Sequence, residues 1–232
     1  MSRQEGGRVE EKRRSAGELP EEVERLGYAR RYLITPEGRA LVEAFVDFFQ
    51  REDRNARILE LGCGDGFWLE TLRNLGFRRL IGIDRSLPLL ELAAEKGLDV
   101  RCGDLYDLDV RNVFDIVLFC DTLEHLPDPE GALLRAHRAL KTHGTLFVLA
   151  PVYESFRCRW QRVVLRRSRW EQAQEDDPSH LQAFSSSRLI ELLEAAHFSP
   201  EHLAYVANWW PGGRLVSVPR GRWGQVGGAC CD

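Results

Sequence analysis

The 232-residue chain contains no apolar run of about 18 residues, the length that a membrane-spanning helix requires. Its charged N-terminus lacks the apolar segment of a secretory signal, so no such signal is expected. The six cysteines include no Cys-x-x-Cys pair, and no spacing of histidines, cysteines and acids indicates a metal site. We therefore expect a cytoplasmic protein with reduced thiols and no bound metal.

The chain also lacks a large excess of either positive or negative charge. The net charge is −4, which disfavours nucleic acid as a partner. Hydrophobic residues make up 44% of the chain and charged residues 29%, as in an ordinary globular protein. Polar residues 1–27 and glycine-rich residues 219–232 are predicted to be disordered, because neither can bury enough apolar surface. Residues 28–218 are predicted to form one domain.

A glycine-rich loop is the most informative segment that is present. Residues 60–66 read Glu-Leu-Gly-Cys-Gly-Asp-Gly, between a short apolar run and a segment with helical spacing. Closely spaced glycines let the chain turn sharply from strand to helix and let a ligand lie against the backbone. The third glycine comes one residue too early for the dinucleotide fingerprint, which disfavours a nicotinamide oxidoreductase.

Three further segments follow at the distances expected of a nucleotide-binding α/β unit. A strand over 79–83 precedes Asp84, which can accept hydrogen bonds from both hydroxyls of a ribose. Asp104 and Leu105 follow a short third strand. A strand over 114–120 ends at Cys120 and is followed by the segment Leu-Glu-His-Leu-Pro-Asp-Pro at 123–129.

Taken together, these segments resemble the class I S-adenosylmethionine-dependent methyltransferases, in particular the small-molecule group that includes the ubiquinone-biosynthesis O-methyltransferases. The resemblance covers about residues 32–210. It extends to residues 177–185, which read Asp-Pro-Ser-His-Leu-Gln-Ala-Phe-Ser. It implies S-adenosylmethionine as cofactor and a Rossmann-like methyltransferase fold of class α/β, with a doubly wound, mostly parallel seven-stranded sheet.

The resemblance also implies a role for each site residue. Glu60 would orient the glycine loop and help to hold the positive end of the cofactor, whereas Asp84 would hold the ribose. Asp104 and the Leu105 backbone would meet the adenine, although Asp104 could instead cap a helix. The carbonyl of Cys120 would face the cofactor's ammonium group. The remaining predicted cofactor-binding residues are Gly62, Cys63, Gly64, Gly66 and Arg85.

The alternation of apolar runs and helical spacing supports this fold. Helices are expected over about 36–49, 66–75, 86–97, 129–141 and 185–196. Strands are expected over about 57–61, 79–83, 99–102, 114–120, 145–150, 203–207 and 214–218. Pro151 is expected to end the fifth strand, and residues 105–112 leave little room for a regular helix.

Two histidines follow strand ends where an acceptor would lie. An imidazole suits the removal of a proton from a phenol or hydroxyl, so His125 and His180 are the predicted catalytic residues. Each could instead be structural, and for His125 a backbone-bonded loop histidine is the competing interpretation.

A basic segment over 153–170, within a predicted lid or substrate insertion over 153–184, carries six arginines at 157, 159, 162, 166, 167 and 169. Its spacing predicts one amphipathic helix, with apolar positions at Phe156, Trp160, Val163 and Val164. Three interpretations stay open: a lid with its apolar face on the pocket, peripheral contact with an anionic membrane, or binding of a phosphate-rich substrate.

The sequence therefore predicts an S-adenosylmethionine-dependent methyltransferase that acts, at oxygen, on a small-molecule or lipid-like acceptor. The alternative is a non-catalytic module of the same fold that binds the cofactor for interaction or regulation. The sequence does not indicate the acceptor or the oligomeric state.

Overall fold

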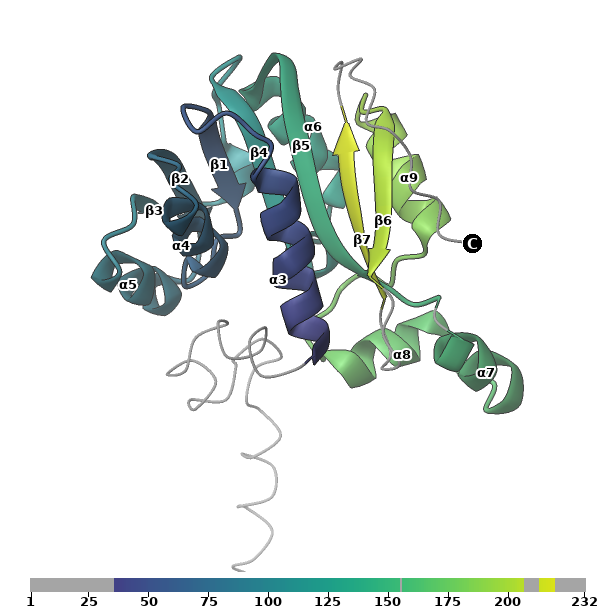
Figure 1. The fold of residues 1–232 in the computed structure, drawn as a ribbon. Helices are drawn as coiled ribbons and strands as arrows, with labels where there is room; N and C mark the ends of the chain where they lie inside the picture. The colour runs from purple at the N-terminus through teal and green to yellow at the C-terminus, as the bar shows by residue number, and fades with distance from the viewer. Residues whose placement is uncertain (1–35, 155, 207–212, 220–232) are drawn as a thin grey trace, which may run out of the picture.

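The computed structural model describes residues 36–154, 156–206 and 213–219. Seven strands form one sheet in the order β3-β2-β1-β4-β5-β7-β6 (Figure 1). The strands are β1 (Arg57–Leu61), β2 (Arg79–Asp84), β3 (Val100–Cys102), β4 (Phe114–Cys120), β5 (Leu140–Val152), β6 (Pro200–Val206) and β7 (Gly213–Pro219). Strands β3, β2, β1, β4 and β5 are parallel, and β7 is antiparallel to both of its neighbours.

Helices cover the sheet on both sides, so the predicted doubly wound fold is confirmed. Figure 1 shows α3 on the near face and α6 and α9 on the far face. The α-helices are α3 (Pro36–Phe49), α4 (Phe67–Asn74), α5 (Leu87–Glu95), α6 (Pro129–Ala139), α7 (Phe156–Val164), α8 (Arg169–Asp176) and α9 (Ser186–Ala195). Short 3-10 turns η2 (Leu105–Asp107) and η3 (Leu123–His125) follow β3 and β4.

Each face of the sheet has its own core. On one face α3 and α4 pack aromatic side chains on the sheet, and Phe45 lies 4.4 Å from Trp68 and 5.3 Å from Phe147 between ring centroids. On the other face α6 and α9 bury small and branched residues such as Ala136 and Leu192 against β4 and β5. These two cores hold the central strands rigidly, since both of their faces are removed from water.

The strand order reverses between β1 and β4, which are neighbours in the sheet and continue in opposite directions across it. In an open α/β sheet, ligands bind at the carboxyl ends of the strands beside such a reversal. The glycine loop that follows β1 and the η3 segment that follows β4 therefore meet at the expected binding edge.

Two predictions about the second half of the chain were wrong. Pro151 does not end β5, which continues to Val152 as it pairs with the antiparallel β7. The basic segment forms two helices, α7 and α8, because the chain reverses at Arg166, which has a φ of 54°. Ser168 then starts α8 with a capping box, in which Glu171 N donates to Ser168 Oγ at 3.1 Å.

Smaller differences concern element ends. Strand β5 begins at Leu140, directly after α6, and β6 begins at Pro200. Ser86 precedes α5 as expected, although its hydroxyl makes no capping bond, whereas Ser185 caps α9 by accepting a bond from Arg188 N at 3.2 Å. The predicted disordered segments 1–27 and 219–232 lie outside the described residues, except for Pro219, which is the last residue of β7.

No helix in the described part of the chain is long and apolar enough to cross a membrane. Four cysteines lie in this part, at 63, 102, 120 and 158, and all four are free thiols.

Candidate active site

The glycine loop makes a tight turn between β1 and α4. Gly62, Gly64 and Gly66 have φ angles of 77°, 51° and 77°. A Cβ on Gly62 would lie 2.4 Å from Thr122 Cγ2, so the loop passes directly against the segment that follows β4. Only glycine combines this left-handed backbone with so close an approach.

Asp84, at the end of β2, braces this loop. Its Oδ2 accepts a hydrogen bond from Gly64 N at 2.8 Å, and its Oδ1 accepts one from Ser86 N at 2.8 Å. The carboxylate is half-buried. Each carboxylate oxygen has a second lone pair, so Asp84 can brace the loop and still accept the hydroxyls of a ribose.

Glu60 lies beneath the loop with an exposed fraction of 1%. Burial raises the pKa of this carboxyl well above its usual value, and the negative charges of Asp65 and Asp84 raise the pKa further. Its Oε2 has no hydrogen-bond partner among the described residues. A buried carboxylate oxygen of this kind suits a positively charged ligand, because an ammonium or sulfonium group would supply the missing counter-charge.

A partly buried ion pair also holds the loop, and the sequence did not indicate it. Lys96, just beyond α5, donates from Nζ to Asp65 Oδ2 at 3.0 Å and to Asp65 O at 2.9 Å. Asp65 is 2% exposed. The pair ties the turn before α4 to the end of α5, which fixes the loop before any ligand binds.

The residues predicted to contact the adenine are Asp104 and Leu105. Asp104 Oδ1 accepts a bond from Tyr106 N at 2.9 Å, so the competing role as a cap of η2 is observed. Leu105 is buried, whereas Arg85 is exposed. Tyr106 donates to Asp128 O at 2.9 Å and thereby ties η2 to the start of α6. The structure places these residues beyond β2 and β3, on the side of the loop where Asp84 lies.

Two buried cysteines line the same edge. Cys63 lies within the loop, and burial raises the pKa of its thiol, which therefore stays protonated. The Cys120 carbonyl accepts a bond from Thr122 Oγ1 at 3.2 Å. Thr122 Oγ1 also lies 3.4 Å from the Gly62 carbonyl, so this threonine joins the ends of β1 and β4.

The structure brings the two predicted catalytic histidines together. The ring centroids of His125 and His180 are 4.8 Å apart, although the residues come from distant parts of the chain. His125 Nδ1 lies 3.0 Å from Ser179 Oγ and 3.3 Å from the Ser179 carbonyl. His180 Nδ1 lies 3.0 Å from the hydroxyl of Tyr153, which is fully buried. Both imidazoles are thus held in place by oxygen atoms.

Acidic groups surround this pair. Glu124 is 1% exposed. One of its carboxylate oxygens and one ring nitrogen each of His125 and His180 all lie within 4.8 Å of one another. Asp177 Oδ1 accepts a bond from Ser179 Oγ at 2.6 Å. Burial acts to raise the pKa of Asp177, but the bonds from Ser179 and the nearby imidazoles outweigh it, so the pKa of Asp177 is lowered.

Sequence reasoning missed Glu124, Tyr153 and Thr122. Glu124 was visible as a carboxylate beside His125, and Tyr153 as an aromatic residue directly after β5. Thr122 carried no signal, because its contact with Gly62 depends on the register of β1 against β4.

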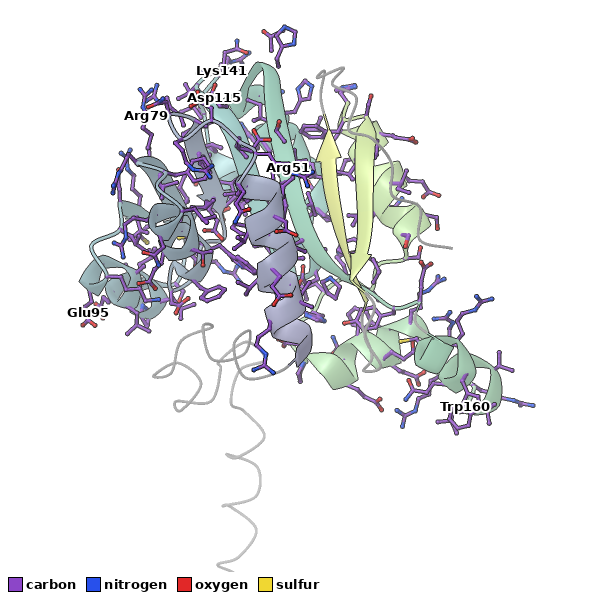
Figure 2. All side chains as sticks on the ribbon, viewed as in Figure 1. Arg51, Arg79, Glu95, Asp115, Lys141 and Trp160 are labelled. Atoms are coloured by element: carbon purple, nitrogen blue, oxygen red, sulfur yellow. The ribbon has the colours of Figure 1, made fainter. Side chains whose placement is uncertain are left out.

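The α7–α8 hairpin (residues 156–176) lies beyond the carboxyl ends of the strands (Figure 1). Cys158 and Gln161 face inward, and Gln172 Nε2 donates to Cys158 O at 2.9 Å. The apolar positions point outward instead: Val163 is 79% exposed and Trp160 48%. Figure 2 shows Trp160 on the side of α7 that faces away from the sheet. Trp160, Val163 and Val164 therefore lie on a solvent-exposed face of α7, whereas the lid interpretation expects them to face a pocket.

Comparisons with known proteins show the family and the fold. Residues 29–203 match the family model described as "Methyltransferase domain". A ubiquinone biosynthesis O-methyltransferase from Bradyrhizobium sp. (strain ORS 278) is 37% identical over 98 residues, which cover 40% of this chain and 38% of that protein. The chain thus spans about two fifths of the length of the curated relatives it matches.

Solved structures show the same fold. A SAM-dependent methyltransferase from Archaeoglobus fulgidus superposes with a TM-score of 0.63 at 15% identity, covering 83% of this chain and 98% of that one. The Burkholderia thailandensis 1,6-didemethyltoxoflavin-N1-methyltransferase, solved with S-adenosylhomocysteine, gives a TM-score of 0.57 at 22% identity and covers 80% of this chain and 78% of that one.

Proposed function

Because the chain belongs to the methyltransferase-domain family, we propose that it transfers the methyl group of S-adenosylmethionine to an oxygen of a small-molecule or lipid-like acceptor. The observation that carries the proposal is the arrangement at the carboxyl ends of β1, β2 and β4. A glycine cradle lies against Thr122, a buried carboxylate oxygen of Glu60 lacks a partner among the described residues, and Asp84 at the end of β2 accepts a hydrogen bond from Gly64 N.

The cofactor supplies an activated methyl group on a sulfonium, so the protein needs mainly to align it with a nucleophile. Glu60 would face the cofactor's positive end, and the Cys120 carbonyl its ammonium group. Asp84 would hold the ribose, with Asp104, Leu105 and Arg85 towards the adenine. Gly62, Cys63, Gly64 and Gly66 would form the surface beneath the methionine portion.

The acceptor would lie on the other side of Thr122, towards His125 and His180. An imidazole there can take the proton of an acceptor hydroxyl, which leaves an oxygen able to attack the methyl carbon. The name of the relatives, ubiquinone biosynthesis O-methyltransferase, supports oxygen as the methylated atom and a lipid-like acceptor.

We further propose that the α7–α8 hairpin rests on an anionic lipid surface. Its exposed apolar residues are Trp160, Val163, Val164, Leu165 and Trp170. Exposed arginines at 159, 166 and 169 accompany them. Apolar side chains beside cations suit the boundary between acyl chains and acidic headgroups, and a lipid-like acceptor would reach the site from there.

Calorimetric titration with S-adenosylmethionine, S-adenosylhomocysteine and NAD tests the cofactor assignment. We expect micromolar binding of the first two and none of NAD. Transfer of a labelled methyl group to phenols with and without an isoprenoid chain then tests catalysis. Cofactor binding without transfer to any acceptor would favour a non-catalytic binding module, and absence of cofactor binding would refute the proposal.

A further inference from the structure

Three carboxylates lie around the glycine loop, and one of them is neutralised by a cation. Lys96 Nζ lies 3.0 Å from Asp65 Oδ2 and donates to Asp65 O at 2.9 Å. The oxygens of Asp84 accept backbone N–H groups, and neither Asp84 nor Glu60 forms an ion pair with a described residue. Lys96 therefore compensates the charge of Asp65 and leaves the other two carboxylates available to a positively charged ligand.

The ion pair belongs to a network of four side chains that alternate in charge. Lys96 Nζ also lies 3.7 Å from Glu70 Oε2, and Glu70 Oε1 lies 3.4 Å from Arg73 Nη2. Two carboxylates and two cations are thus linked, and their formal charges cancel. The Asp65 side chain is 3% exposed and that of Lys96 25%, so water and salt screen this pair less than a surface pair. The network adds no net charge beside the loop as long as all four groups are charged.

Lys96 is held against the loop by contacts that do not depend on Asp65. Arg73 Nη1 donates to the Lys96 carbonyl at 2.5 Å. Two residues further on, Leu98 packs so closely on the loop that a Cβ on Gly66 would lie 2.3 Å from Leu98 Cδ1. Loss of the Asp65 carboxylate would therefore leave the ammonium group of Lys96 beside the loop.

The cofactor and its product differ in charge at the sulfur atom. S-adenosylmethionine carries a sulfonium, whereas S-adenosylhomocysteine is a neutral thioether. Methyl transfer forms a bond between the methyl carbon and the acceptor, breaks the S–C bond and returns that electron pair to sulfur, which removes the positive charge. A fixed charge near the loop therefore changes the affinities for the two compounds by different factors. A loosened loop would weaken both affinities alike.

We propose that Asp65 determines how strongly the loop prefers S-adenosylmethionine over S-adenosylhomocysteine, because it neutralises Lys96. An unpaired ammonium group at this position would repel the sulfonium and not the neutral product, which would then stay bound after each transfer. The inference rests on the proposed function, in which the two compounds follow one another as substrate and product. Asp65 acts on this preference through the charge of Lys96.

Calorimetric titration of Asp65→Asn with each of the two compounds tests the inference. The amide keeps the size of the side chain and can still accept a bond from Phe67 N, which Asp65 Oδ1 accepts at 3.3 Å. We expect the ratio of S-adenosylmethionine affinity to S-adenosylhomocysteine affinity to fall roughly 3-fold to 10-fold from its wild-type value, as one uncompensated and partly screened charge would cause. Asp65→Ser, a second way to remove the carboxylate, should lower the ratio to a similar extent.

Two controls separate the charge of Lys96 from other effects of the substitution. Asp65→Asn combined with Lys96→Met removes both charges and should return the ratio to within about 2-fold of the wild type. Asp115→Asn is the matched control, because Asp115 Oδ1 pairs with Lys141 Nζ at 2.7 Å. Figure 2 shows this second pair at the edge of the sheet opposite the α7–α8 hairpin, whereas the glycine loop follows the carboxyl end of β1, so the ratio should keep its wild-type value.

The ratio of the two affinities distinguishes the outcomes. An equal loss of affinity for both compounds in Asp65→Asn, with the fold checked by circular dichroism and urea unfolding, would mean that the pair only supports the loop and would overturn the inference. A ratio that stays low in the double variant would overturn it as well. Absence of binding of both compounds by the wild type would refute the proposed function and the inference together, whereas wild-type binding with an unchanged ratio in Asp65→Asn and Asp65→Ser overturns the inference alone.

Discussion

Replacing Gly62 with alanine tests the contact on which the cofactor loop depends. A residue with a side chain costs about 1–2 kcal/mol in the left-handed region, and Gly62 has a φ of 77°. The new Cβ would also lie 2.4 Å from Thr122 Cγ2 and 2.6 Å from Thr122 Oγ1. Crowding in a packed region costs about 1–3 kcal/mol more. We therefore expect Gly62→Ala to lower the free energy of unfolding by roughly 2–5 kcal/mol.

Gly76→Ala is the matched control. Gly76 has a φ of 99°, but a Cβ there would meet nothing closer than Arg54 Cδ at 3.7 Å. This variant should show only the backbone cost, about 1–2 kcal/mol, and should bind S-adenosylmethionine like the wild type. The difference between the two variants then measures the contact between the loop and Thr122.

Urea unfolding followed by circular dichroism gives the stabilities, and calorimetry gives the cofactor affinity. We expect Gly62→Ala to bind the cofactor at least about 10-fold more weakly, which corresponds to about 1.4 kcal/mol. Adding Thr122→Ala should restore part of the lost stability, because that change removes both atoms nearest the new methyl group. Equal stability and wild-type affinity in Gly62→Ala and Gly76→Ala would refute the close approach of β1 and β4.

Three further predictions concern other parts of the molecule. Burial, and after it the charges of Asp65 and Asp84, raise the pKa of Glu60 above 4.5, so the folded state binds this proton more tightly than the unfolded state does. The resulting contribution to the free energy of unfolding should be fully present below pH 4.5 and lost as the pH rises through the folded-state pKa. Urea unfolding midpoints of Glu60→Gln, measured across the same pH range, should not show this loss. Asp84→Ala should weaken S-adenosylmethionine binding roughly 100-fold or more in calorimetry while the protein stays folded, since two bonds to a charged acceptor disappear; wild-type affinity would contradict the ribose assignment. Trp160→Glu should reduce sedimentation with phosphatidylglycerol vesicles and leave cofactor affinity unchanged, whereas Leu87→Glu, at another exposed apolar residue, should sediment like the wild type; equal sedimentation of both variants would argue against lipid contact.

Much of the geometry around the glycine loop could be predicted from the sequence, because its determinants are local. The glycine spacing at 62–66 predicts a sharp turn. Asp84 directly follows the apolar run of β2, so its position at the end of that strand could be predicted from the sequence. The observed order β3-β2-β1-β4-β5 then brings Asp84 and the loop together, as the bond between Asp84 and Gly64 N shows.

The acceptor side could be predicted only in part. His125 and His180 were identified as candidates, but their proximity depends on how the 177–184 segment folds back onto η3. The helical spacing of Trp160 and Val163 indicated a helix, which α7 confirms, but it gave no information about where that helix ends or which face points inward. That outcome depends on Cys158 and Gln172, whose contact forms between two helices rather than within one.

One arginine gives the basic hairpin a mechanical connection to the acceptor side. Arg162 donates from Nη1 to the backbone carbonyl of Tyr153 at 2.6 Å, and the hydroxyl of the same tyrosine contacts His180. A displacement of α7 would therefore pull on Tyr153 and shift an imidazole at the opposite end of that side chain. Substitutions on the inner face of α7 would consequently disturb His180 through Tyr153, at a distance from the substituted residue.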